Sequence, residues 1–521
     1  MHRALLLYEI LSNIISYITI DDRPGVWPVE YVTSSTPTLF AIALTCRAFS
    51  EQALDALWNN FKGVEPLMRC AGIIPAPQKR RQEDRYYPII LTEAQLDIIA
   101  RYAHRIRSLE VGMDYWQPDY ITQSFLRTIG GSSKVLTPNL RSLQIGRGLV
   151  HVAPPLLGLH LQHLLINISD HRDDYYLDAV FQCLPSYCPS LESLTVSKPH
   201  NLFRERNAPF VLPLSHAIQK MSKLRTVDVP TITKDALAYL GGLPSIVDIC
   251  LQLPTGSDLE YILGSSRGPN LFENVDSIDL EIRDWPDVEV FTRLWPRKLT
   301  SITLRSEAKF DPSLLQGLCG SLHVREAFKN LQYIHLSEPI HCRLSSNIVI
   351  TIDTIRPLFY LRQLRVVDID TRSCLSISAN DLLEMAEAWH YLEVLLLNKT
   401  DGSMSGAAPV PQWVTVTEVV KFVELRPSLK QLCIGITLST VDYDYDMDKA
   451  SLHALKPRDS DSRLEFLTLR YPHDEEYIRT TYSSEFGILF SKLFPRVKQF
   501  HPLQEIRILH PDSIISQIQH A

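Results

Sequence analysis

A short apolar motif recurs along most of this 521-residue chain, and its spacing limits the folds available. The motif has the form L-x-x-L-x-L, with Ile, Val or Phe as substitutes. Clear copies start at Ile106, Leu140, Leu161, Leu191, Leu224, Ile246, Val275, Leu299, Leu331, Leu364, Leu392, Leu429 and Leu464, and a degenerate copy starts at Val497. The starts lie about 30 residues apart on average, a period typical of stacked structural repeats.

Each copy predicts a short strand, because alternate apolar residues line one face of a strand. Helical apolar patterns separate the copies, for example at 94–104, 176–184, 214–221, 381–389 and 485–493. Strands that alternate with helices at this spacing form a parallel sheet with right-handed crossovers. A doubly wound α/β domain is the alternative, but it has fewer and longer apolar strands with helices on both faces. The many short copies favour stacked repeats, in which neighbours bury one another's apolar faces.

The motif resembles the leucine-rich repeat, which implies an α/β, horseshoe-shaped solenoid over residues 91–521. One feature departs from that family. The position eight residues after the first Leu, normally Asn or Cys, is neither residue in any clear copy. The intervals also vary from 21 to 37 residues. We therefore expect an irregular solenoid with changing curvature and long loops.

The N-terminal stretch follows a different pattern, that of three short amphipathic helices. The first covers Leu7 to Ile18, with apolar residues at i, i+3, i+4 and i+7. The second opens at Thr36-Pro37, where Thr36 is a suitable N-cap and proline fits the first turn. Ser50 is expected to cap the third helix, which carries apolar residues as far as Phe61. These patterns predict a helical module over residues 1–70 and a polar, proline-punctuated linker over 71–90.

The same stretch resembles an F-box, the helical module that docks a substrate receptor onto the Skp-family adaptor of a cullin-RING ubiquitin ligase. The matching segments are Leu7-Tyr8-Glu9-Ile10-Leu11, Leu44-Thr45-Cys46-Arg47-Ala48-Phe49, and Ala53, Leu54, Leu57 and Trp58. Two features depart from the family. Tyr8 stands where the family has Pro, and residues 19–35 form a long insert between the first two helices. The alternative interpretation is an ordinary three-helix cap on the rest of the chain.

The resemblance implies a substrate-recognition subunit of an SCF-type ligase, with an architecture similar to that of the expanded fungal F-box families. Such a chain is not itself an enzyme, because it supplies proximity while other subunits carry the catalytic step. The implied adaptor-binding residues are Leu7, Ile10, Leu11, Ile14, Ile15, Leu39, Ile42, Leu44, Cys46 and Arg47. Trp58 either faces the adaptor or seals the module against the solenoid. The alternative function is an interaction scaffold whose helices only cap the solenoid, where an uncovered apolar edge is a liability.

The strand residues that alternate with the core positions are expected to line the concave face of the solenoid. Acidic residues dominate these positions in the central copies. They are Asp228, Asp248, Asp279, Glu281, Asp368 and Asp370, against the basic residues Arg305 and Arg470. This excess of acids predicts that the concave face is the substrate-binding surface. Its negative charge is expected to attract a protein partner with a basic segment. The alternative is that an open sheet face simply tolerates small polar and acidic residues.

Charge and composition exclude several other functions. A net charge of −7 argues against nucleic-acid binding, which needs a basic surface. No apolar stretch reaches 18 residues, so no membrane span is expected. The nine scattered cysteines show no disulfide or metal spacing, which suits the cytoplasm or nucleus. The aspartates at 442, 444, 446 and 448 lack the Gly and Glu of a calcium loop. No catalytic motif occurs, and neither a cofactor nor a metal is expected.

Overall fold

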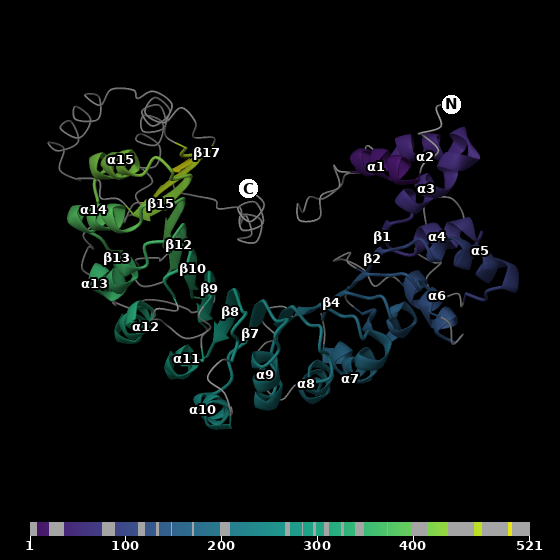
Figure 1. Ribbon diagram of the computed structural model, residues 1–521, viewed down its shortest axis with the longest axis horizontal. Coiled ribbons are helices and arrows are strands. Elements are labelled where there is room, and N and C mark those ends of the chain that lie inside the picture. The colour runs from purple at the N-terminus through teal and green to yellow at the C-terminus, as the bar shows by residue number, and fades with distance from the viewer. Residues whose placement is uncertain are drawn as a thin grey trace. The chain divides into compact units, whose positions relative to one another are not determined.

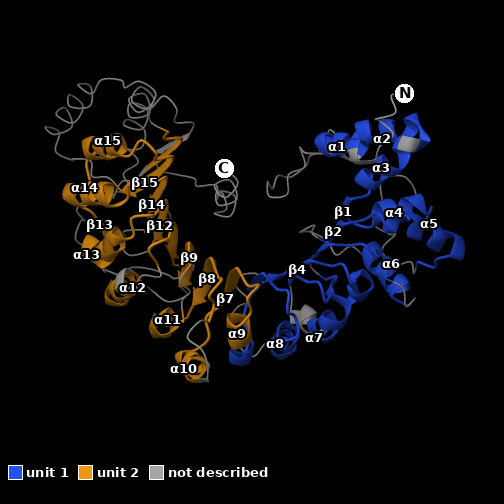
Figure 2. Cartoon of the chain, viewed as in Figure 1, with its two compact units in different colours: residues 1–236, 506–521 blue, residues 237–505 orange. Residues whose placement is uncertain are grey.

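The computed structural model shows an alternation of helices and strands along the chain (Figure 1). It describes residues 8–19, 36–74, 89–112, 120–131, 135–146, 148–168, 171–197, 209–265, 271–283, 285–294, 298–306, 312–324, 328–338, 349–371, 374–398, 414–435, 463–470 and 499–502. The chain divides into two compact units (Figure 2). Unit 1 comprises residues 1–236 and 506–521, and unit 2 comprises residues 237–505. Helix α9 (Lys234–Gly241) includes the point in the sequence where they divide.

In unit 1 the strands lie side by side in chain order, and the pairs from β1 to β6 are parallel. They are β1 (Asn60–Lys62), β2 (Ser108–Val111), β3 (Ser142–Ile145), β4 (His163–Asn167), β5 (Ser193–Ser197) and β6 (Thr226–Val229). Helices α5 (Glu93–Ala103), α6 (Tyr120–Gly130), α7 (His171–Tyr187) and α8 (Val211–Ile218) lie along one side of this sheet (Figure 1). Two 3-10 turns, η2 (Val150–Val152) and η3 (Pro154–Leu156), replace a helix between β3 and β4, the shortest interval between copies.

Unit 2 repeats this plan, again with parallel neighbouring strands. Its main strands are β7 (Asp248–Gln252), β8 (Ser277–Ile282), β9 (Ser301–Ser306), β10 (Tyr333–Ser337), β12 (Val366–Asp370), β14 (Val394–Leu397), β15 (Gln431–Gly435), β16 (Phe466–Arg470) and β17 (Gln499–Pro502). The helical elements are α10 (Gly256–Ser265), α11 (Trp285–Thr292), α12 (Pro312–Val324), α13 (Ile352–Ile355), η6 (Arg356–Tyr360), α14 (Ala379–Ala388) and α15 (Val416–Leu425). A small parallel pair, β11 (Val349–Thr351) and β13 (Cys374–Ser376), was not predicted.

The strand register follows the sequence motif. A strand begins at the third residue of every predicted copy, including the degenerate one. In the copy at Leu140, the first, fourth and sixth residues are at most 1% exposed. Each fully buried Leu or Ile contributes about 1.5–3 kcal/mol relative to exposure, so the copies supply a repeated core. The prediction of an α/β chain with parallel, sequentially ordered strands is confirmed.

The turn before each strand adds a repeated backbone contact. The carbonyl of Arg107 accepts hydrogen bonds from the backbone N–H groups of Arg141 and Ser142, at 2.8 and 2.9 Å. The carbonyl of Arg141 accepts in the same way from Gln162 and His163, both at 2.8 Å. The second residue of one copy therefore holds the start of the next strand, whatever its side chain.

Two predictions at the N-terminal end are wrong. The third helix, α3 (Arg47–Leu57), begins before Ser50, since the extended residue Cys46 occupies the N-cap without a side-chain cap. The carbonyl of Cys46 accepts from the N–H groups of Phe49 and Ser50, both at 3.1 Å, so the first turn forms there. The helix also stops before Phe61, which lies in β1. Gly63 follows β1 with φ +84°, a conformation that favours glycine and turns the chain away from the strand.

Several predictions concern residues that the structure does not describe. The predicted helix at 485–493, residues 75–88 of the linker and the aspartates at 442–448 lie outside the described residues. The boundary between the N-terminal module and the repeats stays a prediction. Within the described ranges, no helix combines the length and apolar character that crossing a membrane requires.

Candidate functional site

The N-terminal helices form a small core of their own. They are α1 (Tyr8–Thr19), α2 (Thr36–Thr45) and α3, followed by the short α4 (Glu65–Cys70). Ile15, Leu39 and Ala53, one from each of the first three helices, are 6%, 3% and 0% exposed. Partly buried apolar residues surround them, including Ile42 and Leu57. We call α1 to α3 the N-terminal helical module.

This core leaves apolar side chains on the surface of α1 and α2. Phe40 and Leu44 are 58% and 71% exposed, and their i, i+4 spacing places them on one face of α2. Ile14 and Tyr17 are 41% and 77% exposed, with an i, i+3 spacing on α1. Exposed apolar residues that share a face are typical of binding surfaces, whereas single ones are common everywhere. These four residues are the exposed apolar set of the module.

The predicted adaptor-binding residues divide into several groups by burial. The buried ones are Leu11, Ile15 and Leu39; the half-buried ones are Ile10, Ile42 and Cys46; and the exposed ones are Ile14, Leu44 and Arg47. Leu7 lies outside the described residues. Phe40 and Tyr17 were not predicted. Helix α2 is apolar on almost every side, so its 3.6-residue period does not mark which side faces the core. On α2, Leu39 and Ile42 face the core while Phe40 and Leu44 face away.

Trp58 lies where the module meets the first repeat. Its side chain is 8% exposed and stacks on Tyr102 of α5, with ring centroids 4.7 Å apart. It also stacks on Phe61 of β1 at 4.9 Å. Aromatic pairs at such distances contribute about 0.5–1.5 kcal/mol beyond area burial. Of the two alternatives for Trp58, the structure shows the one in which it seals the module against the repeats.

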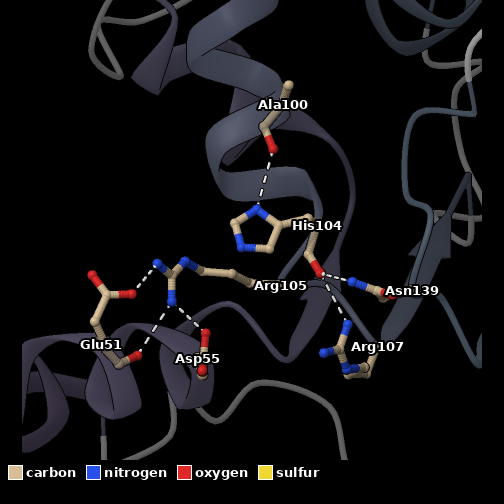
Figure 3. Close-up of polar contacts among 7 residues, drawn as sticks. All are labelled: Glu51, Asp55, Ala100, His104, Arg105, Arg107 and Asn139. Atoms are coloured by element: carbon tan, nitrogen blue, oxygen red, sulfur yellow. Dashed lines mark hydrogen bonds and ion pairs between the residues drawn. The ribbon is translucent and has the colours of Figure 1, made fainter.

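Arg105 joins the same two parts by charge (Figure 3). Its guanidinium contacts Glu51 Oε2 at 2.5 Å and the Asp55 carboxylate, and it donates to the Glu51 carbonyl oxygen at 3.2 Å. Glu51 and Asp55 are one helical turn apart on α3, so both carboxylates reach one guanidinium. The Arg105 side chain is only 10% exposed. We call this group the Arg105 clamp.

The clamp shifts the ionisation of its members. The hydrogen bond from Arg105, assisted by its charge, lowers the pKa of Glu51. Burial by itself would lower the pKa of Arg105, but the hydrogen bonds to Glu51 and Asp55 outweigh it and raise that pKa. Both shifts favour the charged pair. The backbone adds to the clamp, because the carbonyl of Asn59 accepts from the N–H groups of Arg107 and Ser108, each at 2.9 Å.

The residues next to Arg105 tie the first two repeats together. The carbonyl oxygen of His104 accepts from the Arg107 guanidinium at 2.9 Å and from the Asn139 side-chain amide at 2.8 Å (Figure 3). The ring of His104 contacts the Ala100 carbonyl oxygen at 3.3 Å. The loop that carries Arg105 is therefore held from both sides. This arrangement was not predicted, since its residues are far apart in sequence and match no motif.

The predicted substrate-binding acids differ in burial. Asp228 lies in unit 1, and it is half-buried. In unit 2, Asp248, Asp279 and Glu281 on the neighbouring strands β7 and β8 are half-buried. Asp368 and Asp370 on β12 are each only 3% exposed.

Asp279 and Asp368 each contact a side chain on the neighbouring strand. Arg305 of β9 contacts Asp279 Oδ2 at 2.5 Å. The His335 ring of β10 contacts Asp368 Oδ2 at 2.7 Å. The side chain of Arg470 lies outside the described residues.

Within the described ranges, no group of three or more His, Cys, Asp or Glu side chains could hold a metal ion. No family model matches this chain, and a search among curated proteins found no significant match.

Proposed function

We propose that this chain is the substrate-recognition subunit of an SCF-type cullin-RING ubiquitin ligase. The N-terminal helical module binds a Skp-family adaptor, and the repeats bind the protein to be ubiquitinated. The observation that carries the proposal is the exposed pair Phe40 and Leu44 on α2, within the segment that resembles an F-box. An apolar helix face is a common anchor for a partner helix.

The Arg105 clamp and the Trp58 stack support the second half of the proposal. A receptor acts by holding its substrate near the catalytic subunits, so its contribution is positional. A module joined to the first repeat by an ion pair, a ring stack and the β1–β2 strand pair keeps its orientation to that repeat. The chain itself supplies no step of ubiquitin transfer in this proposal.

A scaffold whose helices only cap the repeats is the second candidate. The burial of Trp58 against Tyr102 favours it, because the module does cover the first repeat. A cap does not need exposed apolar residues on its outer side, whereas an adaptor-binding module does. Co-expression of the full chain with a Skp-family adaptor separates the two candidates. Co-elution supports the receptor, and separate elution of two folded proteins supports the scaffold.

For the substrate, we propose a partner segment rich in Lys and Arg that binds over the half-buried acids Asp248, Asp279 and Glu281 of β7 and β8. The salt bridge between Arg305 and Asp279 lies next to this place and limits the attraction. A labelled Lys/Arg-rich peptide should bind more weakly as salt rises, since exposed charges are screened. The double variant Asp248→Asn, Glu281→Asn should bind the peptide less tightly than wild type. The single variant Asp353→Asn, at an exposed position, serves as the control. Equal binding by all three proteins would contradict the substrate proposal and leave adaptor binding untouched.

A further inference from the structure

Three side chains of unit 2 form a hydrogen-bonded series on neighbouring strands. Nδ1 of His335 lies 2.7 Å from Asp368 Oδ2, and Nε2 of His335 lies 3.1 Å from Ser337 Oγ. His335 and Ser337 belong to β10, and Asp368 belongs to β12. The series links a carboxylate, an imidazole and a hydroxyl in one direction, and each step is within hydrogen-bond reach.

The strand geometry explains how these side chains meet. His335 and Ser337 are two residues apart, so both side chains leave the same face of β10. The parallel register places Asp368 opposite His335, and Asp370 opposite Ser337. On the other side of β10, Thr303 lies opposite His335 and Arg305 opposite Ser337. No loop rearrangement is needed to assemble the series.

Burial differs along the series in a way that suits a base and a nucleophile. The side chains of His335 and Asp368 are only 7% and 4% exposed, whereas Ser337 is half-buried. A carboxylate beside Nδ1 holds the proton on that nitrogen and leaves Nε2 to accept another. Burial, strengthened by the charges of Asp368 and Asp279, raises the pKa of Tyr333 on the same strand, so its phenol stays neutral beside the pair.

We propose that Ser337 is a nucleophile toward acyl esters, with His335 as its general base and Asp368 as the positioning residue for His335. This activity is separate from the receptor function proposed above, and neither depends on the other. The sequence analysis did not expect it, because the three residues come from two repeats and match no catalytic motif.

The reaction needs no further co-reactant than water. Ser337 Oγ attacks the ester carbonyl carbon while its proton passes to His335 Nε2. The alcohol then leaves with that proton, and the acyl group stays on Ser337. Water then attacks the acyl carbon while its proton passes to His335 Nε2. The bond to Ser337 Oγ breaks, His335 returns that proton to Oγ, and a carboxylic acid leaves. Arg305, on the strand beside Ser337, is 45% exposed and paired with Asp279, so its charge adds little to stabilisation of the developing oxyanion.

A fluorophosphonate probe tests the proposal on the full chain. The Oγ–P bond forms as the P–F bond breaks, with the serine proton passing to His335 and fluoride leaving. Labelling should map to Ser337 by peptide mass and vanish in Ser337→Ala. Ser301 is a half-buried serine on β9, on the face that also carries Thr303 and Arg305. The control variant Ser301→Ala should label as wild type does. General-base catalysis is worth about 100- to 10,000-fold, so a folded His335→Gln variant should label at least about 100-fold more slowly. No labelling of Ser337, or labelling at the same rate without His335, would overturn the proposal.

A second comparison leaves His335 and Asp368 in place, in case their substitution prevents folding. The Ser337→Cys variant should react with iodoacetamide at pH 6 at least about tenfold faster than Ser301→Cys, because only the first thiol has a base beside it. A structural hydrogen-bond network alone would not produce this difference. Equal alkylation rates at the two positions would therefore also overturn the proposal.

Discussion

Arg105 Nη2 and Glu51 Oε2 lie 2.5 Å apart and join the first repeat to helix α3 across 54 residues of sequence (Figure 3). Glu51 is 70% exposed, and the second partner, Asp55, is 53% exposed. A substitution at Arg105 therefore leaves two carboxylates that water can still reach. The clamp should contribute modestly to stability and more to the fixed placement of the module.

Replacement of Arg105 by Met should loosen this junction. The N–H groups of Arg107 and Ser108, which donate to Asn59, should exchange roughly 5- to 30-fold faster, equivalent to about 1–2 kcal/mol. Hydrogen exchange followed by mass spectrometry measures this directly. Arg69→Met is the matched control, because Arg69 pairs with Glu65 in an exposed i, i+4 bridge, worth about 0.5 kcal/mol or less. Similar effects of both variants would contradict the clamp's role.

The clamp should also respond to acid. The pKa of Glu51 is lowered below its ordinary value of 4.5, chiefly by the Arg105 hydrogen bond. A carboxylate with a lowered pKa in the folded state stabilises the fold above its unfolded pKa. That contribution disappears as the pH falls through the folded pKa. Exchange at the junction should therefore accelerate below about pH 4.5 in wild type, beyond the ordinary change in intrinsic exchange. In Glu51→Gln this extra acceleration should be smaller. A pH profile of Glu51→Gln identical to that of wild type would contradict the role of Glu51.

The repeats were predictable from sequence because each one carries its own signal. The third residue of every copy starts a strand, since the apolar alternation defines the buried face before any partner is known. Strand β1 could not be found in this way. Residues Asn60–Lys62 have no such motif, and they become a strand only by pairing with Ser108–Glu110 of β2.

The surfaces were less predictable, for two physical reasons. Helix α2 is apolar almost all round, so periodicity does not show that Phe40 and Leu44 lie outside its core. Alternation places Asp279 and Asp368 on the open face of their strands. It does not show that Arg305 and His335, on the neighbouring strands, engage them. The motif gives the strand register, but which side chains on neighbouring strands contact each other also depends on their conformations.

Trypsin should cleave the polar linker near Lys79, Arg80, Arg81 or Arg85, as the sequence predicts. The structure adds that the two fragments should stay together, because the β1–β2 pair, the Trp58 stack and the clamp connect them. Size-exclusion chromatography should show one native peak that gives two bands on a denaturing gel. Moderate urea should separate the fragments. First cleavage within the repeats would contradict the predicted linker.

Cysteine labelling should report the burial of the core. Burial raises the pKa of Cys188 and of Cys319 to about 12, so both thiols stay protonated and protected at neutral pH. Cys70 is exposed and should react with a maleimide in the native state. Partial burial of its thiol also raises the pKa of Cys70. The unfolded thiols ionise near pH 9, so each buried thiol's stabilising effect decreases above that pH. Rapid native labelling of Cys319 would contradict the packing of α12.

The affinity of the full chain for a purified Skp-family adaptor, measured by calorimetry for wild type and for Leu44→Asp, tests the central claim most directly. Loss of a desolvated anchor costs about 2–4 kcal/mol, or a roughly 30- to 700-fold weaker affinity. Leu212→Asp is the matched control, because Leu212 is 61% exposed on α8 in the repeats and should leave binding unchanged. The account predicts tight binding by wild type and the control, and weak binding by folded Leu44→Asp. Equal binding by all three proteins, or no binding by wild type, would contradict it.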